Sequence, residues 1–155
     1  MCMDKVDKIP KHYGYGYKVI IDCRTIGYDK VKPTFSPVFQ FTCDTYRKPG
    51  TNGSKPFKFR RWLDSKDYQP VESEGLEYIE AGTVGSYPTG FHCFATLGEA
   101  RSYMSGLEYY AKQRCVVVRA KLSDIVATGK GMGYTNIVCR KIFLFGDVLS
   151  VGKEV

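Results

Sequence analysis

The chain has 155 residues, of which 43% are hydrophobic and 14% aromatic, a composition typical of one globular domain. It contains no apolar run long enough to span a membrane as a helix, and its charged beginning differs from a secretory signal, so we expect a cytoplasmic protein without membrane contacts. The formal net charge of +7 favours acidic partners such as nucleic acid or an acidic protein surface.

The six cysteines are scattered along the chain and form no C-x-x-C pair. With only two histidines, His12 and His92, the chain lacks the clustered ligands of a zinc site, so we expect no metal. The absence of a secretion signal favours free thiols over disulfides. Four cysteines stand in or beside apolar runs, which is typical of buried free thiols: Cys23, Cys93, Cys115 and Cys139.

Residues 1–12 are polar and charged, so we predict a flexible arm there, followed by a single domain over residues 13–155. Alternating tyrosine and aliphatic residues predict a first strand over 13–23. A loop rich in glycine and proline follows, and residues 38–43 predict a second strand.

Turn signals recur between residues 47 and 56, where Pro-Gly and Asn-Gly predict a loop. Residues 57–63 then alternate aromatic and basic side chains, as a half-buried strand does. A further short strand is predicted over 76–81, and residues 82–88 are rich in turn formers.

The most distinctive stretch runs from Gly90 to Tyr103. Residues 91–95 alternate as a strand does, and Thr96 stands three residues before Glu99, the spacing of a capping box. In that motif the threonine hydroxyl accepts the N–H of Glu99, and the glutamate accepts the N–H of Thr96. Apolar residues at helical spacing then predict a helix over 97–112, with a weak point at Gly106.

Beyond this helix, the β-branched residues of 115–122 predict a central strand, followed by a turn at Ser123 and Asp124. Residues 128–134 predict a glycine-rich hairpin loop, because the spacing G-x-G-x-G before a strand does not match a dinucleotide fingerprint. A last long strand over 136–145 completes an α+β single domain: mostly antiparallel sheet or sheets of six to eight strands packed around one principal helix.

Two sets of residues are candidates for binding. Residues 57–62 have the composition of a base-stacking platform with phosphate contacts, in which Lys58, Arg60 and Arg61 are the cations; an amphipathic strand with basic residues outward explains the pattern equally well. His92 stands at a strand end beside a helix start, where anionic groups are favoured, and a purely structural histidine is the alternative.

Two segments resemble small accessory proteins of bacteriophages: G-Y-K-V at 16–19, and G-F-H-x-F-x-T-x-x-x-A-x-x-Y from Gly90 to Tyr103. With the final strands, this resemblance covers about half of the chain. It implies a binding protein that blocks a host defence protein or that protein's nucleic-acid or nucleotide ligand.

The same unit also resembles a strand and helix of the ADP-ribosyltransferase catalytic fold of the poly(ADP-ribose) polymerase type. This second resemblance implies NAD as the cofactor and places His92 where that family has a tyrosine that stacks on nicotinamide. The family's catalytic glutamate would fall near Thr135 or Asn136, where this chain has no carboxylate. The ligand-binding candidates on this match are His92, Arg24, Tyr103, Tyr134 and Asn136.

The favoured expectation is therefore a small cytoplasmic binding protein without a cofactor, which inhibits a host protein. One alternative is an ADP-ribosyltransferase-like enzyme that modifies a host target with NAD. The other is a basic module that binds nucleic acid through Lys58, Arg60 and Arg61.

Overall fold

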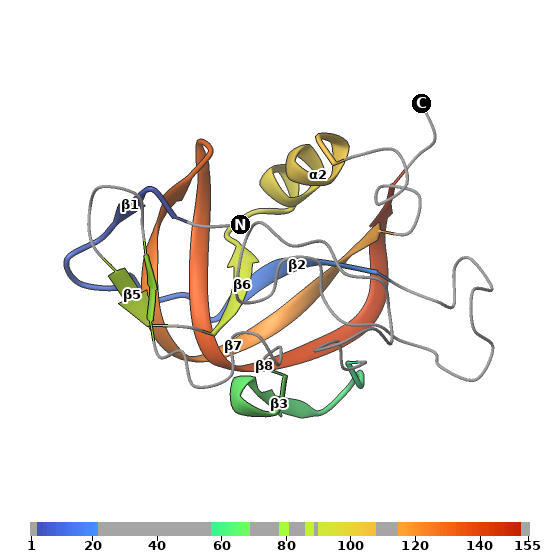
Figure 1. The fold of residues 1–155 in the computed structure, drawn as a ribbon. Helices are drawn as coiled ribbons and strands as arrows, with labels where there is room; N and C mark the ends of the chain where they lie inside the picture. The colour runs from blue at the N-terminus through green and yellow to red at the C-terminus, as the bar shows by residue number, and fades with distance from the viewer. Residues whose placement is uncertain are drawn as a thin grey trace.

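The computed structural model describes residues 3–21, 57–68, 78–80, 86–88, 90–107 and 115–152. Six strands form one antiparallel sheet in the order β1-β7-β2-β6-β8-β3, and β4 and β5 form a second, two-stranded sheet. This arrangement confirms the α+β fold class (Figure 1). The elements are β1 (Lys5–Val6), β2 (Tyr15–Ile21), β3 (Trp62–Asp64), the 3-10 turn η1 (Ser65–Tyr68), β4 (Tyr78–Glu80), β5 (Ser86–Pro88), β6 (Phe91–Phe94), α2 (Leu97–Ser105), β7 (Cys115–Gly131) and β8 (Tyr134–Val151).

Strands β7 and β8 form one long hairpin of 17 and 18 residues, which dominates the fold. Its turn consists of Met132 and Gly133, both with positive φ (52° and 82°), as a two-residue hairpin turn requires. The predicted turn at Ser123 and Asp124 is wrong, because β7 continues through it. The predicted hairpin connection over 128–134 is confirmed at residues 132–133 only, because β7 extends to Gly131 and β8 begins at Tyr134. Asp124 adopts a positive φ of 54° within the strand, just before a register shift that bends β7.

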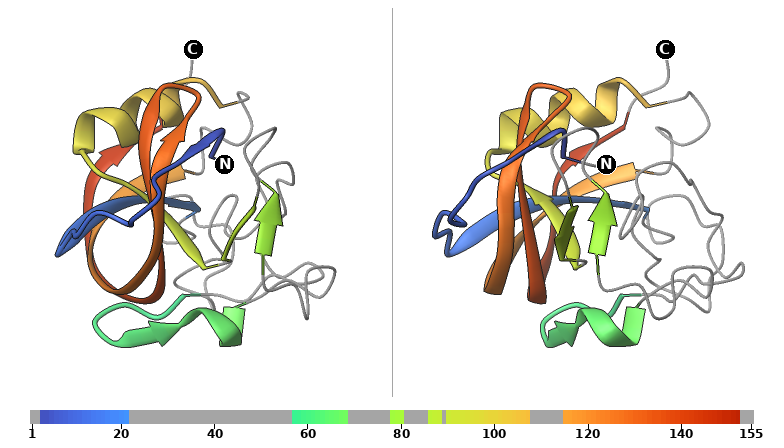
Figure 2. Two further views of the ribbon diagram at one scale, coloured as in Figure 1. Left: turned by 90° about the vertical axis from the view of Figure 1, so that its left-hand side faces the viewer. Right: turned by 60° about the vertical axis from the view of Figure 1, so that its left-hand side comes forward.

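The main sheet closes on itself. Strand β7 pairs with β2 and β8, while β6 pairs with both β2 and β8, so these four strands form a ring (Figures 1 and 2). Register shifts along β7 bend the hairpin enough for this closure. The seam between β2 and β6 is short, with a single backbone pair, Tyr17 and Phe94.

The principal core lies inside this ring. Alternate residues of β7 point into it, namely Val116, Val118, Ala120 and Leu122. Three of the predicted buried thiols, Cys93, Cys115 and Cys139, are confirmed as buried and free, and Cys23 lies outside the described residues. The complete core cluster is Ile20, Phe57, Leu63, Phe91, Cys93, Val116, Val118, Ala120, Leu122, Ile137, Cys139, Ile142 and Leu144.

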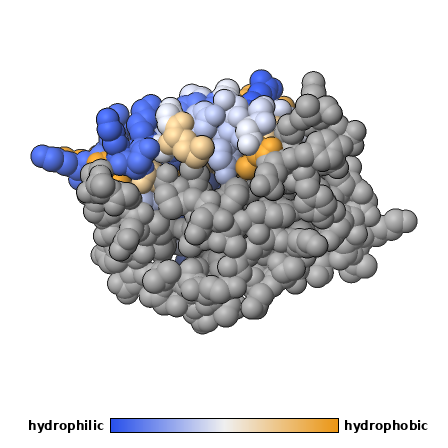
Figure 3. Space-filling view, turned by 45° about the horizontal axis from the view of Figure 1, so that its top comes forward, coloured by the Kyte–Doolittle hydropathy of each residue, from blue (hydrophilic) through white to orange (hydrophobic). Residues whose placement is uncertain are grey.

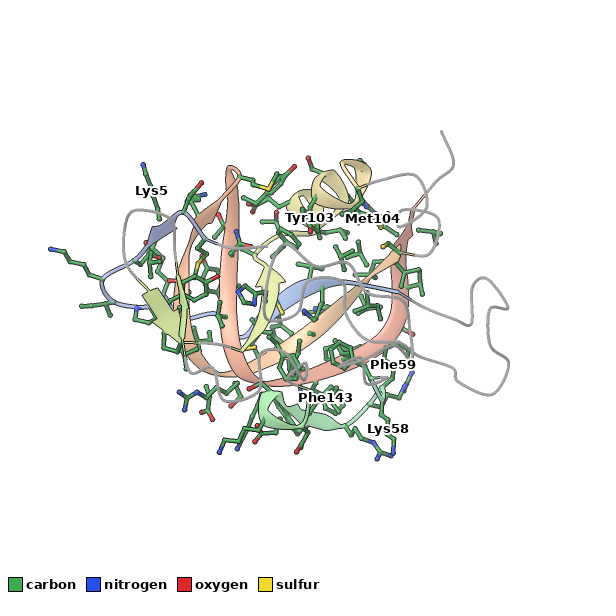
Figure 4. All side chains as sticks on the ribbon, in the orientation of Figure 1. Lys5, Lys58, Phe59, Tyr103, Met104 and Phe143 are labelled. Atoms are coloured by element: carbon green, nitrogen blue, oxygen red, sulfur yellow. The ribbon has the colours of Figure 1, made fainter. Side chains whose placement is uncertain are left out.

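Helix α2 lies on the outside of the ring and covers a second apolar cluster, and Figure 4 labels Tyr103 and Met104 on this helix. Its predicted start is confirmed, since the Thr96 hydroxyl accepts the N–H of Glu99 at 3.2 Å. The Glu99 carboxylate differs from the prediction: it accepts the Thr96 hydroxyl and the backbone N–H of Thr135, which ties the helix to the β7–β8 hairpin. The helix ends at Ser105, and residues 108–112 of the predicted helix lie outside the described residues.

Two shorter predictions need correction. Residues 86–88, predicted as part of a turn, form β5 and pair with β4. Residues 57–61, predicted as strand, are irregular, because Arg60 has a positive φ of 60° and only residues 62–64 pair with β8. The predicted strand over 38–43 lies outside the described residues.

The segment for which we predicted a flexible arm contains β1, whose Lys5 and Val6 pair with Lys130 and Gly129 of β7. Met3 is fully buried, and Thr128 holds the segment further along, since its hydroxyl donates to Asp7 Oδ2 at 2.6 Å. Among the helices of the described ranges, none is sufficiently long and apolar to cross a membrane.

Candidate functional site

The outer face of the sheet carries aromatic and basic side chains on four strands. Residues of β7 and β8 alternate between the core and this face, so that Ala120 and Leu144 point inward while their neighbours point outward. We define the aromatic–basic face by six outward residues: Tyr15 on β2, Arg119 and Lys121 on β7, Phe143 and Phe145 on β8, and Trp62 on β3.

Strand register brings four of these residues into one row. Tyr15 is paired with Lys121, Lys121 with Phe143, and Phe143 with Trp62, across three successive strand boundaries. Directly opposed residues in an antiparallel sheet have their Cβ atoms about 5 Å apart, so their side chains touch. The row therefore joins groups that are distant in the sequence.

The four rings form a continuous chain of contacts. The ring centroids of Tyr15 and Phe145 lie 6.3 Å apart in a stacked arrangement, with an interplanar angle of 23°. Phe145 meets Phe143 edge-to-face at 5.4 Å, and Phe143 meets Trp62 at 5.8 Å. Each contact has the geometry in which aromatic pairs attract one another.

Both cations of the face lie over these rings. The Arg119 guanidinium carbon is 4.3 Å from the Tyr15 ring centroid and 5.8 Å from that of Phe145. Lys121 Nζ is 5.9 Å from the Phe143 centroid and 6.0 Å from the Phe145 centroid. Such contacts hold a cation on a ring face with about 0.5–1 kcal/mol at an exposed site.

The predicted cations Lys58, Arg60 and Arg61 are exposed and lie beside this face. The Arg60 N–H donates to Leu144 O of β8 at 2.8 Å, which runs this segment alongside Phe143 and Phe145 (Figure 4). The predicted aromatic platform is different from the observed one, because Phe57 is fully buried and Phe59 packs against the core.

His92 lies elsewhere, in a buried hydrogen-bonded chain, and is 7% exposed. Its Nδ1 is 3.2 Å from Gly90 O, which only accepts, so Nδ1 carries the proton in the neutral ring. Nε2 then accepts the Tyr87 hydroxyl at 3.0 Å, and the Tyr87 oxygen accepts the Met3 N–H at 3.3 Å. Burial raises the pKa of Tyr87 to about 12, so the hydroxyl keeps the proton that it donates.

Tyr87→Phe is expected to lower the free energy of unfolding by on the order of 1–2 kcal/mol, because it leaves buried His92 Nε2 and the Met3 N–H without the hydroxyl. Urea denaturation of both proteins measures the difference. Tyr15→Phe, which removes a hydroxyl from a side chain that is 45% exposed, is the control and should leave stability within about 0.5 kcal/mol. An equal loss in both variants would contradict the role assigned to the buried chain.

The structure does not bring the remaining ligand-binding candidates together at one site. Tyr103 and Tyr134 lie together between α2 and the hairpin, with ring centroids 6.3 Å apart, and burial raises the pKa of Tyr103. Asn136 is buried and donates to Tyr134 O at 2.9 Å, while His92 contacts Tyr87 instead. Arg24 lies outside the described residues.

Other features of the described residues are weaker candidates for a functional site. Viewed from the side of α2, the coloured residues are mostly hydrophilic or near neutral, and the hydrophobic ones form small separate spots (Figure 3). Groups of three or more His, Cys, Asp or Glu side chains that could hold a metal ion are absent from the described ranges. The aromatic–basic face is consequently the strongest candidate site.

Sequence reasoning missed most of this face. The signal that could have found it is the period of two in β7 and β8, where Arg119 and Lys121, and then Phe143 and Phe145, alternate with aliphatic residues. Comparisons with models of protein families, with curated proteins and with solved structures find no match for the chain.

Proposed function

We propose that the protein binds nucleic acid through the aromatic–basic face. The observation that carries this proposal is the row that strand register forms from Tyr15, Lys121, Phe143 and Trp62. Proteins that bind nucleic acid without sequence preference combine such aromatic side chains, on which bases stack, with cations that follow the phosphates. Both kinds of group alternate on this one face.

The charges of the surrounding surface support the same ligand. Lys58, Arg60 and Arg61 are exposed beside the face, and the whole chain has a formal net charge of +7. Asp64, two residues after Trp62 on β3, has a carboxylate that accepts the backbone N–H of Lys66 at 3.0 Å. An excess of cations beside stacking surfaces favours a polyanion with planar groups over an acidic protein surface.

This proposal is narrower than the inhibitor expected from the phage-like segments and is compatible with it, since occupying the nucleic-acid ligand of a host protein is one way to block that protein. The transferase alternative gains no support from the position of His92. A ring that stacks on nicotinamide needs an open face, whereas this ring is 7% exposed and hydrogen-bonded through both nitrogens.

We expect salt-dependent binding of a fluorescently labelled oligonucleotide, measured by anisotropy between about 50 and 200 mM salt. Because counterions are released from neutralised phosphates, the logarithm of the affinity should fall linearly with the logarithm of salt concentration. Arg119→Gln and Lys121→Gln should each weaken binding and reduce the slope by about 0.7 to 0.9.

Lys5→Gln is the matched control for this experiment. It removes one positive charge from β1, which Figure 4 places on the far side of the molecule from Phe143. Its affinity and slope should stay close to those of the unaltered protein. A flat salt dependence, or equal losses in the Lys5 and Lys121 variants, would refute binding at this face.

A further inference from the structure

We infer that the nucleic acid on this face is single-stranded, with one base stacked at Tyr15, another at Trp62 and the phosphates between them at Lys121. This inference rests on the proposed function and deepens it. It follows from how ring exposure and charge are distributed along the row of residues.

The open ring surfaces lie at the two ends of the row. Trp62 is 51% exposed and Tyr15 is 45% exposed, whereas Phe143 and Phe145 between them are partly buried. A base has access to a large indole surface at one end. At the other end it has access to the Tyr15 ring together with the Arg119 guanidinium, whose planar group also stacks on bases.

The centre of the row is cationic. Lys121 Nζ is nearly equidistant from the Phe143 and Phe145 ring centroids, at 5.9 and 6.0 Å, and so lies over the middle of the ring chain. In the part of the chain that the structure describes, Lys121 has no carboxylate partner and its side chain is exposed. An ammonium in this position meets the phosphates that join two bases stacked at the ends.

The separation of the two ends sets the length of the ligand. Strands β2 and β3 are three strand spacings apart across the row, which is about 14 Å along the sheet. A strand with the 3.4 Å rise of one B-form strand covers this distance in roughly four steps, and a stretched strand needs fewer. We therefore expect a ligand of about three to five nucleotides to span the face.

A duplex does not satisfy this arrangement. Its bases are paired and stacked on one another, so their faces are closed to Tyr15 and Trp62, and only the phosphates remain for Lys121 and Arg119. Unpaired bases, in contrast, present a π-face to any aromatic side chain whatever their sequence.

The test uses oligothymidylates of one to eight nucleotides and a longer duplex whose strands stay paired at the assay temperature, with binding followed by Trp62 fluorescence, since the chain has a single tryptophan. Affinity should rise with length until about three to five nucleotides and then level off. Trp62→Ala and Tyr15→Ala, measured by anisotropy, should each weaken binding of the longer strands by roughly 5- to 150-fold. Replacing the terminal base of the ligand by an abasic site should abolish the effect of one of the two substitutions.

Ile9→Ala is the matched control, because it also removes an exposed hydrophobic side chain, 82% exposed and away from the row, and it should leave affinity unchanged. Melting curves identify any loss that comes from misfolding. Equal affinity for duplex and single strand, or affinity that levels off at one nucleotide, would overturn the inference while leaving the proposed function intact. No binding of any nucleic acid would overturn both.

Discussion

Lys18→Met is expected to abolish a rise of stability with pH that Lys18 contributes to the unaltered protein between its lowered pKa and its usual 10.5. In that window the unaltered protein should gain up to about 1.4 kcal/mol of unfolding free energy per pH unit from this one group. The variant should lack this contribution. Urea unfolding of both proteins at several pH values measures the difference.

The prediction follows from the unusual position of Lys18. Its side chain is 1% exposed and points into the interior of the closed sheet, where Nζ donates to His92 O at 2.7 Å. This carbonyl faces β2: Ala95, three residues on, donates its N–H toward β8, and successive residues of a strand alternate between their two neighbours. Lys18 thus supplies a donor where the β2–β6 seam has only one backbone pair.

Burial lowers the pKa of Lys18 below its usual 10.5, and the neighbouring Cys93 and Cys139 oppose this effect only in part. The unfolded chain then binds a proton that the folded protein does not, so folding is penalised as pH falls below 10.5. The penalty grows until the lowered pKa of the folded protein is reached, and it is constant below that. Stability therefore increases with pH across the window.

One buried thiol acts in the opposite direction at higher pH. Burial raises the pKa of Cys115 to about 12, so above pH 9 the unfolded state loses protons that the folded state retains, and stability falls. This contribution of Cys115 does not involve Lys18 and is common to both proteins, so the difference between them removes it. Methionine also removes the Lys18 donor from His92 O, at a cost of about 1–3 kcal/mol, so the variant should be the less stable protein near pH 10 and recover relative to the unaltered protein as pH falls.

Lys5→Met is the control, because Lys5 is exposed on β1 and its replacement should leave the pH dependence unchanged. A difference between the Lys18 variant and the unaltered protein that stays constant from pH 6 to 10 would contradict the assigned burial of this amine.

Local sequence signals predicted the local structure well. The spacing of Thr96 and Glu99 located the start of α2, because a capping box depends on residues three apart. Period-two alternation located β2 and β6, β-branched residues located the first part of β7, and apolar neighbours identified three of the buried thiols. Each of these features depends only on residues that are close together in the sequence.

The closed sheet and its aromatic–basic face depend instead on pairing between distant segments. Tyr15 and Phe143 approach one another only because β7 pairs with both of their strands, and the register of those pairings is not written in any short stretch. The full length of β7 was not predicted because it also depends on a distant segment, β1. Gly129 and Gly131 are residues typical of a loop. Gly129 instead lies inside the strand, because β1 passes so close that a Cβ at this position would clash with Lys5 O.

Gly90→Ala should cause a large loss of stability for a substitution that adds only one methyl group. A Cβ at this position would lie 2.5 Å from Cys139 O and 3.0 Å from Val138 Cγ1, both on β8. The first of these atoms belongs to the backbone of a central strand, so relief requires β6 and β8 to separate. We expect a loss of about 3 kcal/mol, which corresponds to a melting temperature roughly 6–12 °C lower.

Gly98→Ala adds the same methyl group within the same unit and should have the opposite effect. No atom lies within 4 Å of its Cβ, and the residue is in α2, where alanine stabilises a helix by about 0.5–1 kcal/mol relative to glycine. Because each substitution is glycine to alanine, the change in unfolded-state entropy is similar, and the contrast reports the space available in the folded protein. Equal melting temperatures for the two variants would mean that the chain does not pack Gly90 against β8.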